Sequence, residues 1–324
     1  MLSLVVPCYN EEGNVQDFFS EVNRVFDGKV SDYEFVFVND GSRDKTYQKL
    51  KEIHKSSPQN VQVLSFSRNF GKESAMYAGL SHARGDLVCI IDADLQQRPE
   101  VVLEMLDVLN SNEELDCVTA YQKKRKESKL LSFFKSAFYK IINKMSDVNF
   151  VNGASDFRLM KRTMVDAILS MSEYHRFSKG IFSYVGFNTE YIPYEVALRQ
   201  SGESKWSFKK LFKYALEGIL SFSTAPLKIP THLGVLSTLA SVVYLIVALV
   251  RNFAYDIPVG SDSVIIMLVL FVGGIQLLCL GVLSSYISKM YVQGKNRPIY
   301  ILRDHMKATG TTVSENEVNN DYQN

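Results

Sequence analysis

The chain has 324 residues, with 36 Lys and Arg against 35 Asp and Glu, for a formal net charge of +1. So small a basic excess argues against a nucleic-acid partner, because such proteins need many cations to neutralise phosphates. The four cysteines are scattered without a C-x-x-C pair, which argues against a disulfide framework or a zinc site. Three of them lie in apolar or half-apolar runs and are expected to be small core residues.

The first half of the chain alternates strand-like and helix-like stretches. The start of the chain enters a strand at once, without the cationic lead of a signal peptide, so we expect this part in the cytosol. The expected strands are "LSLVVP", "YEFVFVND", "VQVLSFSRN" and "DLVCIID", and the expected helices cover about 11–26, 45–55 and 73–84. Strands that alternate with helices predict an α/β fold with a parallel sheet covered on both faces.

A polar cluster follows each of these strands: "CYNEE", "NDGSRD", "SRNFGK" and "DADLQQ". Since ligands bind at the carboxyl ends of strands in open α/β sheets, the clusters are expected to build one site. Asp92 and Asp94 repel each other unless a cation or hydrogen-bond donors lie between them. A nucleoside diphosphate sugar with Mg²⁺ or Mn²⁺ meets that need, with Asp94 and Gln96 as metal ligands. Asp92 then suits the ribose or a metal-bound water.

Two other nucleotide-binding signatures are absent from the sequence. "FGKES" would need a glycine where Phe66 stands to be a Walker-type loop, and no G-x-G-x-x-G follows the first strand.

The C-terminal part contains two apolar runs, at 233–250 and 264–287. Each meets the requirement of about 18 to 20 residues for crossing a bilayer. The basic residues after the second run place the tail in the cytosol. "SFKKLFKYALEGILSF", which begins at Ser207, predicts an amphipathic helix, either at the bilayer surface or packed on the catalytic domain.

These features predict four regions. They are a cytosolic catalytic domain at 1–206, an amphipathic juxtamembrane helix at 207–230, two transmembrane helices at 231–288, and a cytosolic tail at 289–324 that is disordered from about 307.

Six motifs together resemble family 2 glycosyltransferases of the GT-A fold. They are "VVPCYNEEGNV", "VNDGSRDKT", "RNFGKESAMYAGL", "DADLQQRPE", "DFRLMKR" and "RQSGESKW", in this order. With two C-terminal spans, the chain resembles the branch that glycosylates polyprenyl phosphate, which includes dolichyl-phosphate mannosyltransferases and bactoprenol glucosyltransferases. The resemblance implies a Rossmann-like, mostly parallel catalytic sheet.

The resemblance also implies a set of site residues. The implied donor-binding residues are Pro7, Tyr9, Glu11, Asp40, Asp92, Ala93, Asp94, Arg199 and Lys205, and the implied metal ligands are Asp94 and Gln96. Asp94 and Asp156 are the implied catalytic residues, and Asp156 is either a base or an orienting group. Because a phosphate monoester has a second pKa of about 6, it needs little help from a base. Arg125 and Arg158 are the candidates for receiving the acceptor phosphate.

Two departures from the family pattern stand near this site. Gln97 replaces an acid that relatives commonly carry, which removes one negative charge beside the metal. Ala154 and Ser155 replace a Thr-Gly pair, so the backbone there is less permissive.

The function that follows is inverting transfer of a hexose from a UDP-sugar, such as UDP-glucose, to undecaprenyl phosphate on the cytosolic leaflet of a bacterial cell membrane. The product would serve cell-envelope glycosylation. The expected partners are the bilayer, a flippase, a downstream glycosyltransferase and further copies of the chain. The alternatives are a GDP-mannose-dependent mannosyltransferase and a noncatalytic subunit that binds nucleotide sugars. A processive polysaccharide synthase is disfavoured because "GESKW" lacks the Q-x-x-R-W motif.

Overall fold

The structure is a computed structural model that describes residues 1–122, 154–171, 173–174, 176–195 and 262–309, with part of 230–250. The chain divides into two compact units. The first unit comprises Met1–Ser136, Phe150–Trp206 and Pro298–Asn324, and the second comprises Ala137–Asn149 and Ser207–Arg297.

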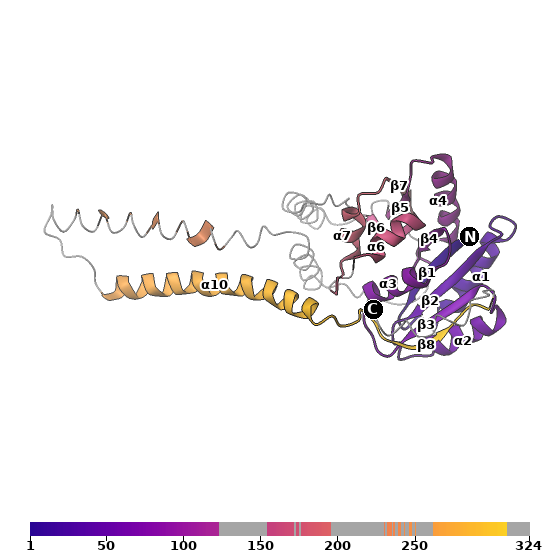
Figure 1. Cartoon of the computed structure of the whole chain (residues 1–324), viewed down its shortest axis with the longest axis horizontal. Helices are drawn as coiled ribbons and strands as arrows, with labels where there is room; N and C mark the ends of the chain where they lie inside the picture. The colour runs from indigo at the N-terminus through magenta and orange to yellow at the C-terminus, as the bar shows by residue number, and fades with distance from the viewer. Residues whose placement is uncertain are drawn as a thin grey trace. The chain divides into compact units, whose positions relative to one another are not determined.

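The first unit is built on one eight-stranded sheet with the order β7-β5-β6-β4-β1-β2-β3-β8 (Figure 1). Its strands are β1 (Leu2–Cys8), β2 (Tyr33–Asn39), β3 (Val61–Phe66), β4 (Leu87–Ile90), β5 (Cys117–Gln122), β6 (Ala154–Lys161), β7 (Thr189–Tyr194) and β8 (Leu302–Met306). The central strands β4, β1, β2 and β3 are parallel, and β5 pairs in parallel with β7. Strand β6 runs antiparallel to both of its neighbours, and β8 runs antiparallel to β3. The sheet is therefore mostly parallel, as predicted.

The described part of the first unit contains six helices between these strands. They are α1 (Val15–Phe26), α2 (Thr46–Ser56), α3 (Lys72–His82), α4 (Pro99–Ser111), α6 (Arg162–Leu169) and α7 (Ser178–Tyr184). Helix α1 starts four residues later than predicted, because the Glu11 carbonyl accepts the N–H groups of Asn14 and Val15 and forms a turn there.

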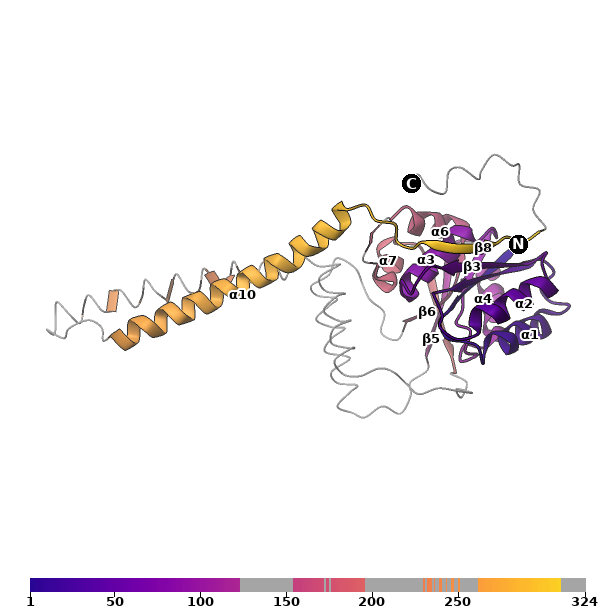
Figure 2. The same cartoon turned by 90° about the horizontal axis from the view of Figure 1, so that it is seen from below.

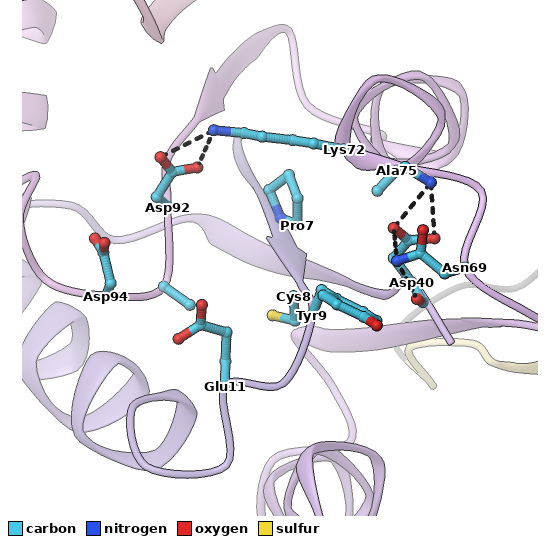
Figure 3. Close-up of a pocket in the computed structure, with 12 residues that line it drawn as sticks. Pro7, Cys8, Tyr9, Glu11, Asp40, Asn69, Lys72, Ala75, Asp92 and Asp94 are labelled. Atoms are coloured by element: carbon cyan, nitrogen blue, oxygen red, sulfur yellow. Dashed lines mark hydrogen bonds and ion pairs between the residues drawn. The ribbon is translucent and has the colours of Figure 1, made fainter. Parts of the chain in front are cut away.

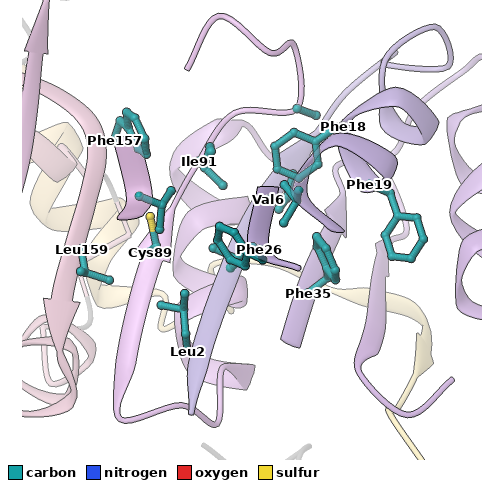
Figure 4. Close-up of a cluster of buried hydrophobic side chains, with 14 of the residues drawn as sticks. Leu2, Val6, Phe18, Phe19, Phe26, Phe35, Cys89, Ile91, Phe157 and Leu159 are labelled. Atoms are coloured by element: carbon teal, nitrogen blue, oxygen red, sulfur yellow. The ribbon is translucent and has the colours of Figure 1, made fainter. Parts of the chain in front are cut away.

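The main hydrophobic core lies between the sheet and helices α1, α2 and α4 (Figure 4). Phe18 and Phe26 of α1 are fully buried, and Phe18 meets Phe37 of β2 edge to face at 6.3 Å between ring centres. Phe157 and Leu159 of β6 face the same core, so Asp156 and Arg158, which alternate with them, point to the opposite face of the sheet. Along β6, the apolar side chains therefore pack in the core while the charged side chains face the other side of the sheet.

Helix α3 packs on the opposite face of the sheet, and a glycine sets its distance. A Cβ on Gly79 would lie 2.2 Å from Cγ1 of Val5 in β1. The absence of that carbon lets the helix approach β1 closely. Helices α6 and α7 lie on this face too, α6 against α3 and α7 against β6. The second half of α3 is therefore held closely against β1.

Strand β8 was not anticipated from the sequence, which predicted only a cytosolic tail there. The strand extends the sheet beyond β3, with Met306 paired to Val63 and His305 to Leu64 (Figure 2). Just before it, the Tyr300 ring stacks on Phe66 at 5.1 Å, and Tyr47 of α2 hydrogen-bonds Asp304. Thr309 then donates its N–H to the Pro58 carbonyl. Residues from 310 lie outside the described part of the chain.

In the second unit the structure describes one long helix, α10 (Asp262–Gly294). Within it, Val272–Gly294 is long and apolar enough to cross a membrane by length and composition, with a mean hydropathy of 1.3 and none of the window buried. It is the one such helix among the described residues, and it overlaps the predicted second span. The residues described between 230 and 250 are helical. Most of the expected amphipathic helix at 207–230 lies outside the described residues.

Candidate active site

A cavity of about 470 Å³ opens at the carboxyl ends of β1, β2 and β4, beside the start of α3 (Figure 3). Its lining residues are Pro7, Cys8, Tyr9, Glu11, Asp40, Asn69, Gly71, Lys72, Ala75, Asp92, Ala93 and Asp94. The volume falls within the range of about 300 to 1,000 Å³ that is typical of small-ligand pockets. The structure describes seven residues of the expected donor-binding set, and all seven line this cavity: Pro7, Tyr9, Glu11, Asp40, Asp92, Ala93 and Asp94.

The loop after β1 is held in place by the loop after β2. Asn10 has a left-handed backbone, with φ of 57°, and exchanges hydrogen bonds with the second loop. Its N–H donates to Ser42 Oγ at 3.0 Å, and its Oδ1 accepts the Arg43 N–H at 2.9 Å. Thr46 Oγ1 accepts the Glu11 N–H at 2.8 Å. These bonds present Tyr9, which is 40% exposed, at the pocket.

Asp40 lines the pocket, but its carboxylate also organises the loop that leads into α3. One oxygen accepts the Phe70 N–H at 2.6 Å, and the other accepts the Gly71 N–H at 3.0 Å and Asn69 Nδ2 at 2.9 Å. The residue is 3% exposed, and burial raises the pKa of its carboxyl group although the N–H groups of Phe70 and Gly71 oppose the shift. Asp40 therefore shapes the wall of the pocket from beneath.

The turn after β4 directs the acidic side chains. Leu95 has a left-handed backbone, with φ of 57°, which is uncommon for a branched residue and turns the chain sharply between Asp94 and Gln96. Asp94 Oδ1 accepts the Gln96 N–H at 3.1 Å. Gln97 forms two hydrogen bonds with Asp92. Its Oε1 accepts the Asp92 N–H at 2.8 Å, and its Nε2 donates to the Asp92 carboxylate at 3.2 Å. A carboxylate in place of Gln97 could accept the first of these bonds but not donate the second.

Lys72 links Asp92 to Asp156. Its Nζ lies 2.7 Å from Oδ1 and 2.9 Å from Oδ2 of Asp92, and 3.5 Å from Oδ2 of Asp156. Figure 3 shows the ammonium reaching across the cavity to Asp92. Burial lowers the pKa of Lys72, but the charges of Asp92 and Asp156 outweigh it and raise the pKa, so the side chain is a cation. No role for Lys72 was predicted from the sequence, although the residue lies in one of the motifs that carry the family resemblance.

Asp156 lies among positive charges. Burial raises the pKa of its carboxyl group, but Lys72, Lys179 and Arg158 outweigh this effect and lower the pKa below its usual value. Asp156 is therefore ionised at neutral pH. It comes from β6 and Asp92 comes from the end of β4, so the antiparallel pairing of these two strands brings the acids to one place.

Arg158 is more enclosed than an acceptor-binding residue on a surface would be. It is 5% exposed, its guanidinium lies over the Phe182 ring at 3.6 Å, and Nη2 donates to the Ser155 carbonyl at 2.9 Å. Its buried Nε has no hydrogen-bond partner among the described residues. The other residues expected at the acceptor or diphosphate, Arg125, Arg199 and Lys205, lie outside the described part of the chain.

The donor set at the turn after β4 fits a hard divalent cation held jointly with a substrate. The described residues contain no cluster of three or more His, Cys, Asp or Glu suited to a metal. Asp94 and Gln96 offer only oxygen ligands, while Asp92 is paired with Lys72 and Gln97. Mg²⁺ and similar ions are commonly bound through one or two carboxylates plus substrate phosphates, which is consistent with this arrangement.

The fold and the pocket define an α/β protein with an acidic ligand site at the strand ends, and comparison with known proteins gives its family. The family model described as glycosyl transferase family 2 matches residues 3–169, and a second model, the GtrB C-terminal hairpin, matches residues 225–290. The chain belongs to glycosyl transferase family 2 and is a glycosyltransferase, which confirms the resemblance.

Similarity to curated relatives extends over nearly the whole chain. The SfII prophage-derived bactoprenol glucosyl transferase of Shigella flexneri is 39% identical over 93% of this chain and 97% of its own length. A prophage bactoprenol glucosyl transferase homolog of Escherichia coli K12 is 38% identical over 93% of this chain and 98% of its own. An uncharacterized glycosyltransferase of Synechocystis, sll0501, is 38% identical over 94% and 95%.

Proposed function

We propose that this glycosyltransferase transfers a hexose from a UDP-sugar, such as UDP-glucose, to polyprenyl phosphate, with inversion at the anomeric carbon. The observation that carries the proposal is the match of 38–39% identity over almost the full length of relatives named bactoprenol glucosyl transferase. Bactoprenol is a polyprenol, and its phosphate would be the acceptor. The acidic pocket at the strand ends supports a nucleotide-sugar donor.

The donor would occupy the cavity at the strand ends. Pro7, Tyr9 and Glu11 would hold the nucleoside, while Asp92, Ala93 and Asp94 would contact the ribose and diphosphate. Asp94 and Gln96 would hold Mg²⁺ or Mn²⁺, which would supply positive charge to the leaving diphosphate. Arg199 and Lys205 would add further cations from outside the described residues. Lys72, already in the cavity, supports this placement of anionic groups.

The transfer step needs little proton movement. An oxygen of the acceptor phosphate would attack the anomeric carbon, and the bond from that carbon to the diphosphate oxygen would break. A phosphate monoester is largely dianionic at neutral pH because its second pKa is about 6. The lowered pKa of Asp156 keeps it ionised, so it is suited to orienting Lys72 and nearby cations. Arg158 would contribute positive charge from the wall behind Asp156, and Arg125 would contact the acceptor phosphate.

The C-terminal part would hold the catalytic domain at its lipid substrate. Helix α10 supplies one apolar segment of sufficient length, and the hairpin family match at 225–290 supports a second helix before it. We propose a multi-pass protein of a bacterial cell membrane with its catalytic domain on the cytosolic side. A flippase and a downstream glycosyltransferase would use the product.

The proposal is tested by lipid labelling with the full chain in detergent or nanodiscs. Radiolabelled UDP-glucose, UDP-galactose, UDP-N-acetylglucosamine and GDP-mannose are offered separately with undecaprenyl phosphate and Mg²⁺ or Mn²⁺. Metal-dependent label in the organic phase from a UDP-hexose supports the proposal. Label from GDP-mannose alone would contradict the UDP-sugar assignment and identify GDP-mannose as the donor. Nucleotide-sugar binding without any transfer would favour a noncatalytic subunit.

A matched pair of variants tests the metal assignment. Asp94→Asn removes the charge at the proposed ligand, and Asp107→Asn makes the same change on the exposed side of α4. We expect Asp94→Asn to lose transfer while it stays folded, and Asp107→Asn to keep wild-type activity. A folded and fully active Asp94→Asn variant would contradict the metal role.

A further inference from the structure

The first turn of α3 carries two adjacent charged residues with different partners. Lys72 reaches Asp92 and Asp156, as described above. Glu73 instead binds the start of α7: its carboxylate accepts the Ser178 N–H at 2.9 Å and is also hydrogen-bonded by the Ser178 hydroxyl. One turn of helix therefore connects the donor pocket, Asp156 and α7. The two contacts of Glu73 span 105 residues of sequence.

Helix α7 supplies one of the charges that act on Asp156 and packs against another. Lys179, next to Ser178, is one of the charges that lower the pKa of Asp156. Phe182 packs under the guanidinium of Arg158, whose charge also acts on Asp156. Ser178 and Phe182 are each 5% exposed. The position of α7 thus fixes Lys179 near Asp156 and packs Phe182 against the guanidinium of Arg158.

We propose that Glu73 is a positioning residue for sugar transfer, because it fastens α7 to α3 and so holds Lys179 beside Asp156 and Phe182 against Arg158, where an anionic acceptor would bind. The inference rests on the proposed function, since the acceptor is taken to be an anionic phosphate. Glu73 does not contact the reacting atoms. It acts through α7.

The charge of Glu73 adds a pH dependence that is separate from its contact with Ser178, since the carboxyl group can accept the Ser178 hydrogen bonds in either protonation state. Burial and the negative charge of Asp156 raise the pKa of Glu73 to about 7, while the hydrogen bonds from Ser178 and the charge of Arg176 oppose the shift. Its neighbour Lys72 is paired with Asp92 and Asp156. As Glu73 ionises above neutral pH, it adds a second negative charge beside Asp156. An anionic acceptor is then repelled, so transfer should decline at alkaline pH.

The experiment compares Glu73→Gln, Glu73→Ala and Ser178→Ala with the exposed control Glu104→Gln in the full chain. Gln keeps an acceptor for Ser178 but cannot ionise, and Ala removes both properties. For Glu73→Ala we expect the acceptor KM to rise about tenfold, a loss of about 1.4 kcal/mol, with the donor KM unchanged. Ser178→Ala should raise the acceptor KM by a smaller factor, since the Ser178 N–H remains.

The pH profile separates positioning from a purely structural role. The wild type and Glu104→Gln should gain activity as the acceptor phosphate ionises near pH 6 and lose it above about pH 7. Glu73→Gln should keep the rise and lose the decline. An unchanged decline in Glu73→Gln, or equal changes of donor and acceptor KM in Glu73→Ala, would overturn the inference.

Hydrogen–deuterium exchange tests the same contact without any substrate. Peptides covering Ser178–Tyr184 should exchange at least tenfold faster in Glu73→Ala than in Glu104→Gln, while peptides of β1 and β2 stay protected. Faster exchange in a protein that transfers no sugar would support the contact and reject the proposed function. Unchanged exchange in α7 would reject the positioning role, whatever the activity.

Discussion

Replacement of Lys72 by Met removes the one cation that the structure places between Asp92 and Asp156 among the described residues. Met keeps the length and the apolar stem of the side chain, so the helix and its packing on β1 should persist. The two carboxylates then face each other without this counter-charge. The pKa of Asp156 should rise, because burial raises it and the largest opposing charge has gone.

The magnitude follows from the two ion pairs that are lost. A hydrogen bond to a charged group contributes about 1.5 to 3 kcal/mol. The side chain of Lys72 is 44% exposed, so water screens both pairs and the lower value applies to each. The combined loss is about 3 kcal/mol, which corresponds to a fall of roughly 100-fold in kcat/KM if the pairs are used in the transition state.

The assay is labelled-sugar transfer at neutral pH with saturating metal. Lys72→Arg keeps the charge in another geometry and should lose only about tenfold. Lys55→Met, on the exposed end of α2, should match the wild type. A Lys72→Met variant that is folded, by thermal unfolding, and transfers sugar within threefold of the wild-type rate would refute the reasoning.

Three further predictions concern the scaffold of the site. Glu34 is 1% exposed, and its Oε2 lies 2.7 Å from Nη2 and 2.8 Å from Nε of Arg84. Arg84→Met leaves this buried carboxylate without its cation, so it should lower the free energy of unfolding by about 3 kcal/mol in denaturant titration. Adding Glu34→Gln to that variant should restore part of the lost stability. A loss below about 1 kcal/mol would mean that Ser3, Gln62 and the backbone N–H of residue 84 are sufficient partners for Glu34. Gly41→Ala places a Cβ 2.3 Å from the Arg68 carbonyl carbon, at a backbone φ of +61°. The change should distort the Asp40 loop and weaken nucleotide binding more than it lowers thermal stability. Nucleotide affinity equal to that of the wild type would show that the loop adapts. Because the pKa of Glu73 is raised from 4.5 to about 7, the contribution of Glu73 to folding stability should be fully present below pH 4.5, and about 3 kcal/mol of it should be lost as pH rises to 7. This loss should be absent from Glu73→Gln but present in Glu104→Gln.

The local sequence was sufficient for the strands that carry the site. The runs that become β1 to β4 are buried along almost their whole length, so their apolar patterns stand out and were placed within a few residues. Since parallel strands end at a common edge, the polar clusters behind them were expected to meet. The cavity lined by Pro7, Asp40, Asp92 and Asp94 confirms that they do.

The strands at the sheet margins were not found in this way. Five residues of a polar tail, Leu302–Met306, carry no strong apolar signal, and the strands at the other margin, β5, β6 and β7, pair with residues distant in sequence. β8 forms because it pairs with the otherwise open edge of β3 and because the Tyr300 ring stacks on Phe66. An open edge is a property of the assembled sheet.

The sequence by itself determined the family, the central strands and the acids at their ends, because the patterns for buried strands and turns depend on residues that are neighbours in the sequence. Only the tertiary structure decided which charges meet. Lys72 reaches acids 20 and 84 positions away, and Glu73 reaches Ser178. Electrostatic partners are selected by distance in space, and that distance is set when β6 pairs with β4 and α3 packs on β1 through Gly79.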